Sequence, residues 1–506
     1  MIQYLKKNVL KHPELFYYLF FASLLFAKGI GLYDGQKAFK VILLFAGCCW
    51  LFKMVFTRYR AKEIVIAGCL LLLGVITYHS SGDKGLLLYI MMITGAKNVP
   101  LKKIFHVGLV TWLISFGGTF FLTATHLINS PFKVHEKFGE LIIRWGLGST
   151  HPNVLHVSYL LLTFFVGFCL AERMNLKWLL LLMLGNCYTF LYSFSFTGFA
   201  AVTVYLILCA YWMVHKKIGA FDKIAVKAGA LCCVLISMVA PLVLSGKAFD
   251  ILNKLLNTRL RLSKIYLTKY PFSWFGIKIA DITSSSATMD CSYVYAYVAY
   301  GAIVFAVIVF GYGLLICKLC KEERGIELCI VLACLVAGIT EPFLFNTSFK
   351  NISLVFFAEL IYGSCECFEK KKADHKMEDI KSALAKKKKI LAGVLIVGCL
   401  IGVFGYRLLA MQPERIIVPR SESDLDSTFY EELNIDESEI EEDDVVYGTP
   451  KEGTPWMQLT GAAVKLEQLR GEITSGILTG IFLTVLMAGM YINRAKNRYG
   501  IKREEG

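Results

Sequence analysis

The chain has 506 residues, of which 56% are hydrophobic and 18% are charged, and its mean hydropathy is +0.56. A soluble protein of this length with so much apolar surface would aggregate, so the composition indicates a polytopic membrane protein. The formal charge of +15 does not indicate a nucleic-acid partner, because excess lysine and arginine is expected in the cytoplasmic loops of a membrane protein. We therefore expect an all-α fold that crosses the membrane many times.

Apolar runs predict about twelve transmembrane helices in the first 365 residues and two more near the C-terminus. The first run, 15–32, follows a basic segment and has no small-residue cleavage site, so it predicts an uncleaved helix rather than a signal peptide. The run at 85–96 is short enough to be re-entrant. The other runs lie at 38–56, 63–79, 104–126, 154–171, 176–194, 198–214, 224–244, 291–316, 326–343, 350–363, 390–409 and 473–491.

The distribution of lysine and arginine predicts the orientation of these helices. If the N-terminus is cytoplasmic and the run at 85–96 spans the membrane, every segment on the cytoplasmic side contains lysine or arginine. The segment 369–389 alone has nine lysines and four acids. We therefore predict that the short run spans the membrane and that both termini are cytoplasmic.

Three long segments then lie on the outer side, at 127–153, 245–290 and 410–472. The predicted domains are a polytopic membrane domain at 1–365, a basic cytoplasmic linker at 366–389 and a C-terminal helix pair at 390–506.

The outer segment of the helix pair is strongly acidic. Residues 421–447 hold twelve acids and no lysine or arginine. Such a run cannot bury a core, so we predict that it is disordered. A short helix from Trp456 to Arg470 is then expected to lead into the last membrane helix.

The first outer segment ends at a turn that carries candidate site residues. Between Arg144 and Asn153 the sequence has two glycines and Pro152, which predict a structured turn. His151 is a candidate general base, because imidazole titrates near neutrality, or else it caps the helix that begins near Asn153. Arg144 and Asn153 are candidate substrate-binding residues.

A later turn between two helices, Tyr192–Gly198, is rich in hydroxyl side chains. These hydroxyls either bind sugar or satisfy the unpaired backbone groups at the two helix ends.

The second outer segment, 245–290, opposes the charge bias with seven lysines and arginines against three aspartates. These cations either bind an anion such as a diphosphate, or extend to lipid phosphates from an amphipathic helix at the interface. Leu252, Leu256 and Arg259 recur at helical spacing, which predicts one helix lying flat on the bilayer. Arg259 and Arg261 are candidate substrate-binding residues, because a guanidinium binds phosphate oxygens with paired donors and stays charged.

A carboxylate precedes the helix that follows this loop. Asp290 is a candidate general base, or it is an N-terminal cap favoured by the helix dipole. Tyr293, Tyr297 and Tyr300 share one face of the helix, as aromatic rings do in sugar-binding clefts and at membrane interfaces. Ser292, Tyr293 and Tyr297 are therefore candidate substrate-binding residues.

Two more carboxylates belong to apolar runs. Glu341 lies near the outer end of the run 326–343, and Glu359 lies inside the run 350–363. Carboxylates in apolar helices are costly and usually functional. Glu341 is closer to the predicted outer face, so it is the second candidate for the general base.

The order of these pieces resembles the bacterial O-antigen polymerase and ligase (Wzy-like) superfamily, in particular the capsule and exopolysaccharide polymerases of Gram-positive bacteria. The pieces are the turn at His151–Asn153, the turn ending at Gly198, Thr258-Arg259-Leu260, Phe275-Gly276, and the stretch from Asp290 to Gly301. The resemblance implies a GT-C-like arrangement of about twelve helices over residues 1–365. It also implies metal-independent glycosyl transfer from undecaprenyl-diphosphate-linked sugars at the outer face of the bacterial cell membrane.

Two positions depart from the family pattern. Where the short turn usually reads Ser-Arg-Thr-Gly, this chain has Ser195-Phe196-Thr197-Gly198, so that arginine is missing. Asp290 stands where the ligases carry a histidine, which favours a polymerase over a ligase.

We therefore expect a polysaccharide polymerase that joins lipid-diphosphate-linked repeat units into a capsule, exopolysaccharide or O-antigen-like polymer. Arg144, Arg259 and Arg261 would hold the donor's diphosphate, and Asp290 or Glu341 would take the proton of the acceptor hydroxyl. No cofactor or metal is expected, because no outer segment has carboxylates or histidines at ligand spacing. The expected partners are the lipid-linked donor and acceptor, membrane lipids, a flippase and a chain-length regulator.

Two other functions are kept as alternatives. A lipid-linked oligosaccharide flippase would need charges midway along several helices and short outer loops, whereas this chain has one long cationic loop. A membrane scaffold that binds partners through its C-terminal part leaves the cationic loop unexplained. The C-terminal helix pair itself is interpreted as an arm whose acids compete with diphosphate for that loop or attract a basic partner.

Overall fold

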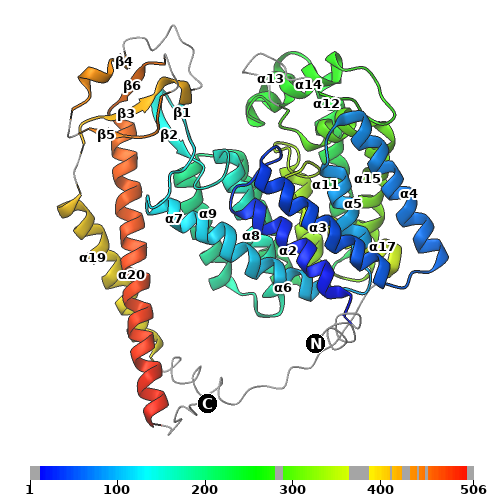
Figure 1. Cartoon of the computed structure of the whole chain (residues 1–506), viewed down its shortest axis with the longest axis horizontal. Coiled ribbons are helices and arrows are strands. Elements are labelled where there is room, and N and C mark those ends of the chain that lie inside the picture. The colour runs from blue at the N-terminus through cyan, green and yellow to red at the C-terminus, as the bar shows by residue number, and fades with distance from the viewer. Residues whose placement is uncertain are drawn as a thin grey trace. The chain divides into compact units, whose positions relative to one another are not determined.

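The computed structural model describes residues 12–279, 289–363, 387–410, 413–423, 433–441, 444–450 and 454–498. It divides into two compact units (Figure 1): unit 1 comprises Met1–Leu122 and Gly146–Glu366, and unit 2 comprises Thr123–Trp145 and Cys367–Gly506. The second boundary, at Glu366, falls in the predicted basic linker, which lies outside the described residues up to residue 386. Part of the first outer loop groups with the C-terminal residues, and the sequence did not predict this grouping.

The helices follow the predicted apolar runs. In the described part of the chain, nine helices are long and apolar enough to cross a membrane, which confirms a helical multi-pass membrane protein. The helices of unit 1 are α2 (Glu14–Gly29), α3 (Lys37–Phe56), α4 (Ala61–Ser81), α5 (Gly85–Gly95), α6 (Leu101–Trp112) with α7 (Gly118–Ala124), α8 (Pro152–Cys169), α9 (Leu176–Ser193), α10 (Phe196–His215), α11 (Ala220–Val234) with α12 (Ala240–Val243), α13 (Gly246–Leu255), α14 (Arg259–Lys269), α15 (Ser292–Lys321), α16 (Gly325–Ala337), and the 3-10 helix η4 (Ile352–Phe357) with α17 (Ala358–Tyr362).

The short run predicted at 85–96 forms α5, a helix of 11 residues. At 1.5 Å per residue it is about 16 Å long, roughly half of the hydrocarbon thickness. Its side chains are almost all buried against other helices of unit 1. The helix is therefore enclosed by protein, and its crossing of the membrane stays a prediction.

A break in α15 fixes the end of the cationic loop. Gly301 has φ 87° and ψ 170° inside this helix. The turn at 273–277 fits against the break, and three backbone hydrogen bonds of 2.9–3.3 Å join it to residues 298–303. A Cβ on Gly301 would lie 2.3 Å from Gly276 N, and a Cβ on Gly276 would lie 1.9 Å from Ala299 O. Both positions therefore require glycine.

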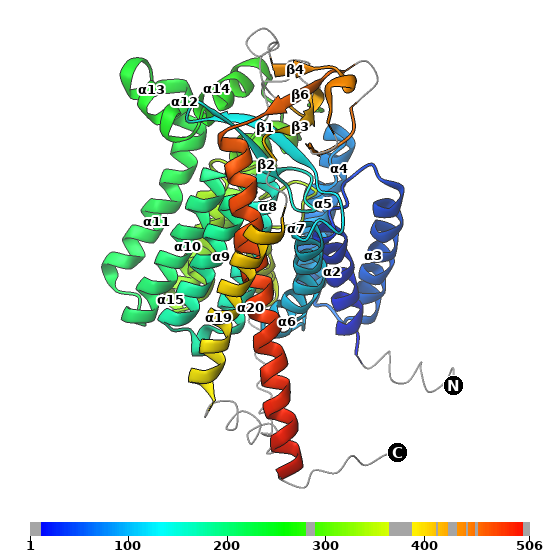
Figure 2. The same ribbon diagram turned by 90° about the vertical axis from the view of Figure 1, so that its left-hand side faces the viewer.

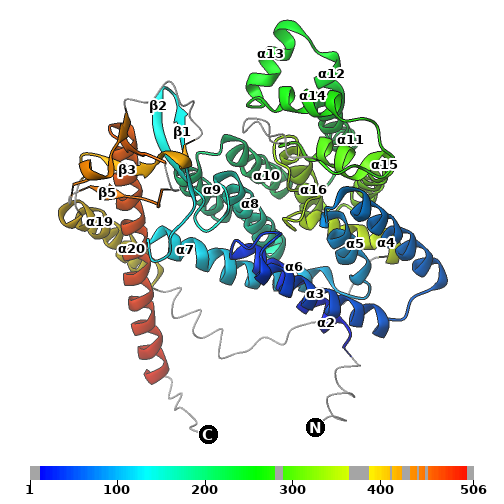
Figure 3. The same ribbon diagram turned by 45° about the horizontal axis from the view of Figure 1, so that its top comes forward.

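The amphipathic stretch of the cationic loop is two helices, α13 and α14, rather than the single flat helix predicted (Figure 3). Asn257 and Thr258 between them have φ 50° and 70°, so the chain leaves helical geometry before Arg259. All ten residues of α13 are at least partly exposed, whereas Arg259 at the start of α14 is buried. Only α13 is free to lie on a bilayer surface.

Unit 2 combines two helices with β-structure, which departs from the purely helical expectation (Figure 2). A two-stranded hairpin comes from the first outer loop, and a four-stranded sheet of order β4-β6-β3-β5 lies at one end of the helix pair. The elements are β1 (Phe132–Lys137), β2 (Glu140–Trp145), α19 (Lys388–Leu409), β3 (Ile416–Pro419), β4 (Asn434–Ile435), β5 (Val445–Val446), β6 (Trp456–Leu459) and α20 (Ala462–Arg498).

Glycines let α19 and α20 pack backbone to backbone. Gly398 and Gly402 on α19 face Gly476 and Gly480 on α20, and a Cβ on Gly402 would lie 2.3 Å from Ser475 O. Both helices thus carry a small-xxx-small pattern, which allows the close approach that stabilises helix pairs in lipid. The paired helices (Figure 1) are the two runs predicted at 390–409 and 473–491.

The acidic outer segment is folded where the structure describes it, which corrects the prediction of disorder for residues 433–441 and 444–447. Ile435 packs with Ile417 and Trp456 in a small hydrophobic core. Asp444 accepts a 2.8 Å hydrogen bond from Arg415, which holds the pKa of the Asp444 carboxyl below its usual value. The predicted helix from residue 456 begins only at residue 462, because residues 456–459 pair with β3 as strand β6.

The hairpin of the first outer loop packs against this C-terminal part of unit 2. Arg470 on α20 is 1% exposed and donates a 2.9 Å hydrogen bond to Ile143 O. Trp145 Nε1 donates to Glu467 at 2.9 Å, and Lys133 pairs with Glu422 at 3.0 Å. The described acids are therefore partly neutralised by cations inside unit 2.

We predict that Gly301→Ala lowers the thermal stability of the detergent-purified protein. A positive φ strains a residue with a Cβ by about 1–3 kcal/mol, and the methyl group would also push the 273–277 turn out of the break. Gly313→Ala on the same helix is the control, since a Cβ there has nothing within 4 Å. Equal melting temperatures for the two variants would contradict the docking of the turn.

We predict that a chain ending at Gly363 exposes the β1–β2 hairpin to trypsin. The hairpin would lose its contacts with Arg470, Glu467 and Glu422, and a hairpin without such packing is marginally stable. Peptide mapping after brief digestion should show cleavage at Lys133, within β1. A chain ending at Arg498 retains these contacts and is the control, and equal cleavage rates in the two proteins would contradict the prediction.

Candidate functional site

The candidate site begins with an ion pair that ties the cationic loop to the start of α15. Arg259 Nη2 lies 3.0 Å from Asp290 Oδ2, and the side chains of Arg259 and Asp290 are 10% and 21% exposed. Arg259 Nη1 also donates to Asn257 O at 2.8 Å, which the left-handed turn before α14 makes possible. The sequence placed both residues in the site but did not predict that they pair with each other.

Glu341 provides a second carboxylate in the same region. Its side chain is 4% exposed, and Oε1 accepts a 2.7 Å hydrogen bond from Thr197 Oγ1 in the first turn of α10. A hydrogen-bond donor stabilises the ionised form of a carboxylate, which compensates in part for its burial.

Backbone contacts join the ion pair to Glu341. Arg259 Nε donates to the carbonyl of Thr340 at 3.4 Å, and Ser292 Oγ donates to the carbonyl of Glu341 at 2.5 Å. The structure therefore brings Arg259, Asp290 and Glu341 together from three separate stretches of the chain. A guanidinium paired with a carboxylate can exchange that carboxylate for phosphate oxygens.

Ser292 and Tyr293 were predicted to bind substrate, and the structure assigns both to the core. Ser292 is fully buried, and its hydroxyl also accepts from Leu344 N at 3.1 Å. Tyr293 is 3% exposed and donates to Leu335 O at 2.8 Å. Both buried side chains thus hydrogen-bond to backbone groups within unit 1. Tyr297 is partly exposed and meets Phe305 edge to face.

His151 caps α8, as the alternative interpretation proposed. Its Nδ1 accepts from Asn153 N at 3.2 Å, so the neutral ring carries its proton on Nε2. A further proton would have to enter at Nδ1 and break the cap. This geometry argues against His151 as the general base, and it gives the backbone of Asn153 a structural role.

The two remaining predicted arginines lie in different surroundings. Arg261 is exposed on α14, and its backbone N–H donates to Asn253 Oδ1 at 2.9 Å. Arg144 belongs to unit 2, where it is 6% exposed in strand β2. A role for either guanidinium in binding phosphate stays a prediction.

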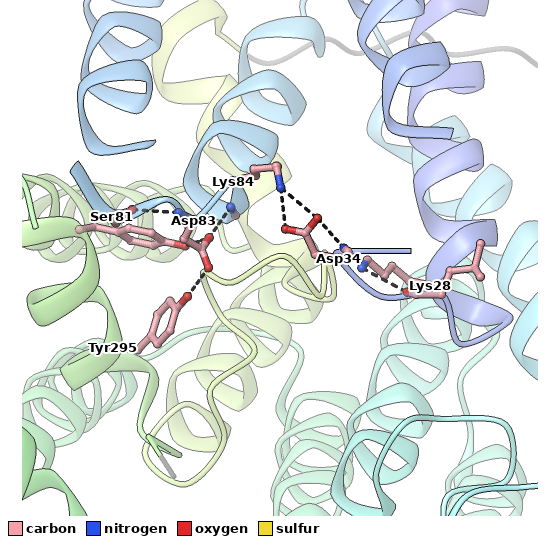
Figure 4. Close-up of polar contacts among 10 residues, drawn as sticks. Lys28, Asp34, Ser81, Asp83, Lys84 and Tyr295 are labelled. Atoms are coloured by element: carbon pink, nitrogen blue, oxygen red, sulfur yellow. Dashed lines mark hydrogen bonds and ion pairs between the residues drawn. The ribbon is translucent and has the colours of Figure 1, made fainter. Parts of the chain in front are cut away.

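Asp83 is a polar centre that the sequence reasoning missed. It lies in the turn between α4 and α5, where Oδ1 accepts from Gly85 N at 2.5 Å. Figure 4 shows Tyr295 of α15 donating to the same carboxylate, and Tyr300 Oη lies 2.8 Å from Oδ1. These contacts bind the α4–α5 turn to the segment of α15 that precedes its break. The only sequence signal was an aspartate in a Ser-Ser-Gly-Asp-Lys-Gly turn, which is also typical of ordinary loops.

Three charged side chains lie beside this centre (Figure 4). Lys84 pairs with Asp34 at 2.8 Å, and both side chains are about 30% exposed. Lys28 Nζ donates to Leu32 O at 3.2 Å and sits 3.8 Å from the centroid of the Phe39 ring. The C-terminal end of α2 and the α4–α5 turn therefore contribute cations as well as the carboxylate of Asp83.

The structure shows the partners of two other charged side chains in the predicted apolar runs, Glu359 and Lys350. Glu359 is paired with Lys318 at 3.2 Å and also with Arg324, so the structure gives it a role in an ion-pair network. Lys350 is 3% exposed and donates to Ser158 Oγ at 2.7 Å, with no carboxylate within 4 Å among the described residues. Its position just ahead of an apolar run is the only feature by which the sequence marks it.

Fold and site together define a helical multi-pass membrane protein with a charged, hydroxyl-rich cluster in unit 1. Across the described residues, no group of three or more His, Cys, Asp or Glu side chains is arranged to hold a metal ion. No family model, no curated protein and no solved structure matches the chain.

Proposed function

We propose that the chain is a polysaccharide polymerase of the Wzy-like class, which joins lipid-diphosphate-linked oligosaccharide repeat units at the outer face of a bacterial cell membrane. The observation that carries the proposal is the ion pair of Arg259 with Asp290, held by a hydrogen bond from Arg259 to Thr340, the residue before Glu341. Glycosyl transfer to a hydroxyl needs a cation for the leaving diphosphate and a base for the proton, and this cluster supplies both. In this proposal unit 1 crosses the membrane twelve times in a GT-C-like arrangement, with both termini cytoplasmic.

The reaction assigned to the cluster balances without a metal. The acceptor hydroxyl oxygen forms a bond to the anomeric carbon of the donor sugar, and the bond from that carbon to the diphosphate breaks. The proton of the acceptor hydroxyl passes to a carboxylate. The diphosphate leaves as an anion, and Arg259 holds it with Arg261 as a further candidate ligand.

The contacts favour Glu341 as the base and give Asp290 a positioning role. Asp290 is engaged by Arg259, so it orients the guanidinium and yields its place when the diphosphate arrives. Glu341 is held by a hydroxyl and buried, an environment in which a carboxylate can be tuned toward proton transfer.

The flippase alternative gains no comparable support. A flippase requires charges along the transport path within the helices. Glu359, the carboxylate that the sequence places inside an apolar run, is neutralised by Lys318 and Arg324.

The test is polymer synthesis by the purified protein in vesicles supplied with lipid-linked repeat units. Arg259→Lys should lower the rate about 10²-fold, because lysine cannot give a paired contact to phosphate. Glu341→Gln should lower it by about 10²–10⁴-fold through loss of the base, and Asp290→Asn should cost less. Lys269→Ala, which removes an exposed cation of the same helix, is the control.

The result can reassign the roles or reject them. An inactive Asp290→Asn beside an active Glu341→Gln would make Asp290 the base. Full activity in Arg259→Lys would reduce that residue to general electrostatics. Wild-type protein that makes no polymer from verified substrate would reject the polymerase proposal itself.

A further inference from the structure

A buried polar chain runs from the interior of unit 1 to the turn that contacts Glu341. Asn186 and Ser193 lie on α9 and His156 lies on α8, and all three side chains are 0% exposed. His156 Nε2 lies 2.7 Å from Asn186 Oδ1, and His156 Nδ1 lies 2.9 Å from Ser193 Oγ. Each of these groups would be costly in an apolar interior without its partner.

The donor and the acceptor of each hydrogen bond between Asn186, His156 and Ser193 can be assigned. Asn186 Nδ2 donates to Phe199 O and to Thr203 Oγ1, each at 3.2 Å, so Asn186 Oδ1 faces the imidazole as an acceptor. His156 therefore carries its proton on Nε2, and Nδ1 accepts from the hydroxyl of Ser193. Ser193 Oγ in turn accepts from the backbone N–H of Ser195 at 3.2 Å.

This row of hydrogen bonds ends in the turn between α9 and α10. The turn has an unusual backbone conformation. Phe194 is left-handed, with φ 43° and ψ 38°. Ser195 caps α10 by accepting from Gly198 N at 3.3 Å, which places Thr197 in the first helical turn. A Cβ on Gly198 would lie 2.5 Å from the Cβ of His156, so α10 begins directly against the imidazole-bearing residue.

We propose that Asn186, His156 and Ser193 are positioning residues that hold this turn so that Thr197 keeps its hydrogen bond to Glu341. The proposal rests on the proposed function, in which Glu341 takes the acceptor's proton. Thr197 acts directly on the carboxylate, and the three buried residues act through the turn. The hydroxyls of Tyr192–Gly198 thus support the helix ends, which is one of the two roles that the sequence left open, and they also orient a reacting group.

The charged groups near Glu341 belong to elements outside this chain of hydrogen bonds. Arg259 donates to the neighbouring carbonyl of Thr340, and the charge of Lys350 is close enough to interact with that of Glu341. Substitutions at Thr197 or Ser193 leave the side chains of Arg259 and Lys350 unchanged. A changed pH dependence in those variants therefore reports on the donated hydrogen bond.

The experiment is the pH–rate profile of polymer synthesis by the reconstituted protein. A donor stabilises the ionised carboxylate, so Thr197→Val should move the acidic limb to higher pH by about one unit. Thr197→Ser keeps the donor and should retain the wild-type limb. Ser193→Ala, which frees the turn from His156, should move the limb in the same direction by a smaller amount.

Thr163→Val is the control, because Thr163 is a buried residue of α8 whose hydroxyl bonds only within its helix, to Leu160 O at 2.6 Å. Its acidic limb should match the wild type. Rates of Thr197→Val and Ser193→Ala that fall equally at every pH, with no shift of the limb, would overturn the positioning role and leave these residues as packing elements. If Glu341→Gln keeps the full wild-type profile, the proposed base is wrong, and that separate outcome removes the foundation of the inference.

Discussion

The break in α15 at Gly301 is the constraint on which the packing of the cationic loop against the helices of unit 1 depends. A helix interrupted at one residue leaves backbone groups without partners, and the 273–277 turn supplies them. That turn joins residues 273–277 of the cationic loop to α15, and the ion pair between Arg259 and Asp290 joins the start of α14 to the residues just before α15. The loop is thereby fixed to α15 at two places, with Arg259 held beside the segment that carries Glu341.

Asp83 in the α4–α5 turn adds further hydrogen bonds to the same part of α15. Tyr295 and Tyr300 bind its two carboxylate oxygens, and Ser80 donates to Gly276 O in the docked turn. The α4–α5 turn, the cationic loop and α15 therefore share one set of hydrogen bonds. This rigidity would help the proposed reaction. The side chain that binds the diphosphate and the side chain that acts as the base must stay at a fixed distance while one bond forms and another breaks.

Much of the helical framework could be predicted from the sequence, because long apolar runs are strong signals. The sequence also singled out Arg259 in the unusually cationic loop, and Asp290 and Glu341 at the ends of apolar runs, as candidates. Their pairing was not found, because partners from separate stretches leave no mark in a single sequence.

Helical periodicity did not predict which tyrosines of α15 act together. Residues 295 and 300 lie about 140° apart around an α-helix, so a pattern of faces does not join them. Asp83 lies between the two hydroxyls and joins them in the structure. Tyr293, placed on the predicted sugar-binding face, instead contacts the backbone of α16.

Composition misled most in unit 2. Twelve acids in 27 residues predict disorder from composition alone. The segment folds where it is described because the apolar residues between the acids pack together. Ile435 and Ile440 pack near Trp456, and Arg415 neutralises Asp444. The grouping of the first outer loop with the C-terminal helices had no sequence signal, because the buried Arg470 and the hairpin are more than 300 residues apart.

The measurement that tests the central claim most directly is the distribution of lipid-linked glycans in a strain that lacks this protein. A polymerase acts after repeat units have crossed the membrane. Single repeat units should therefore accumulate on their lipid carrier in the outer leaflet, where an impermeant glycosidase or lectin can reach them. Accumulation of the same units in the inner leaflet would contradict the account and indicate that the chain moves lipid-linked sugars instead of joining them.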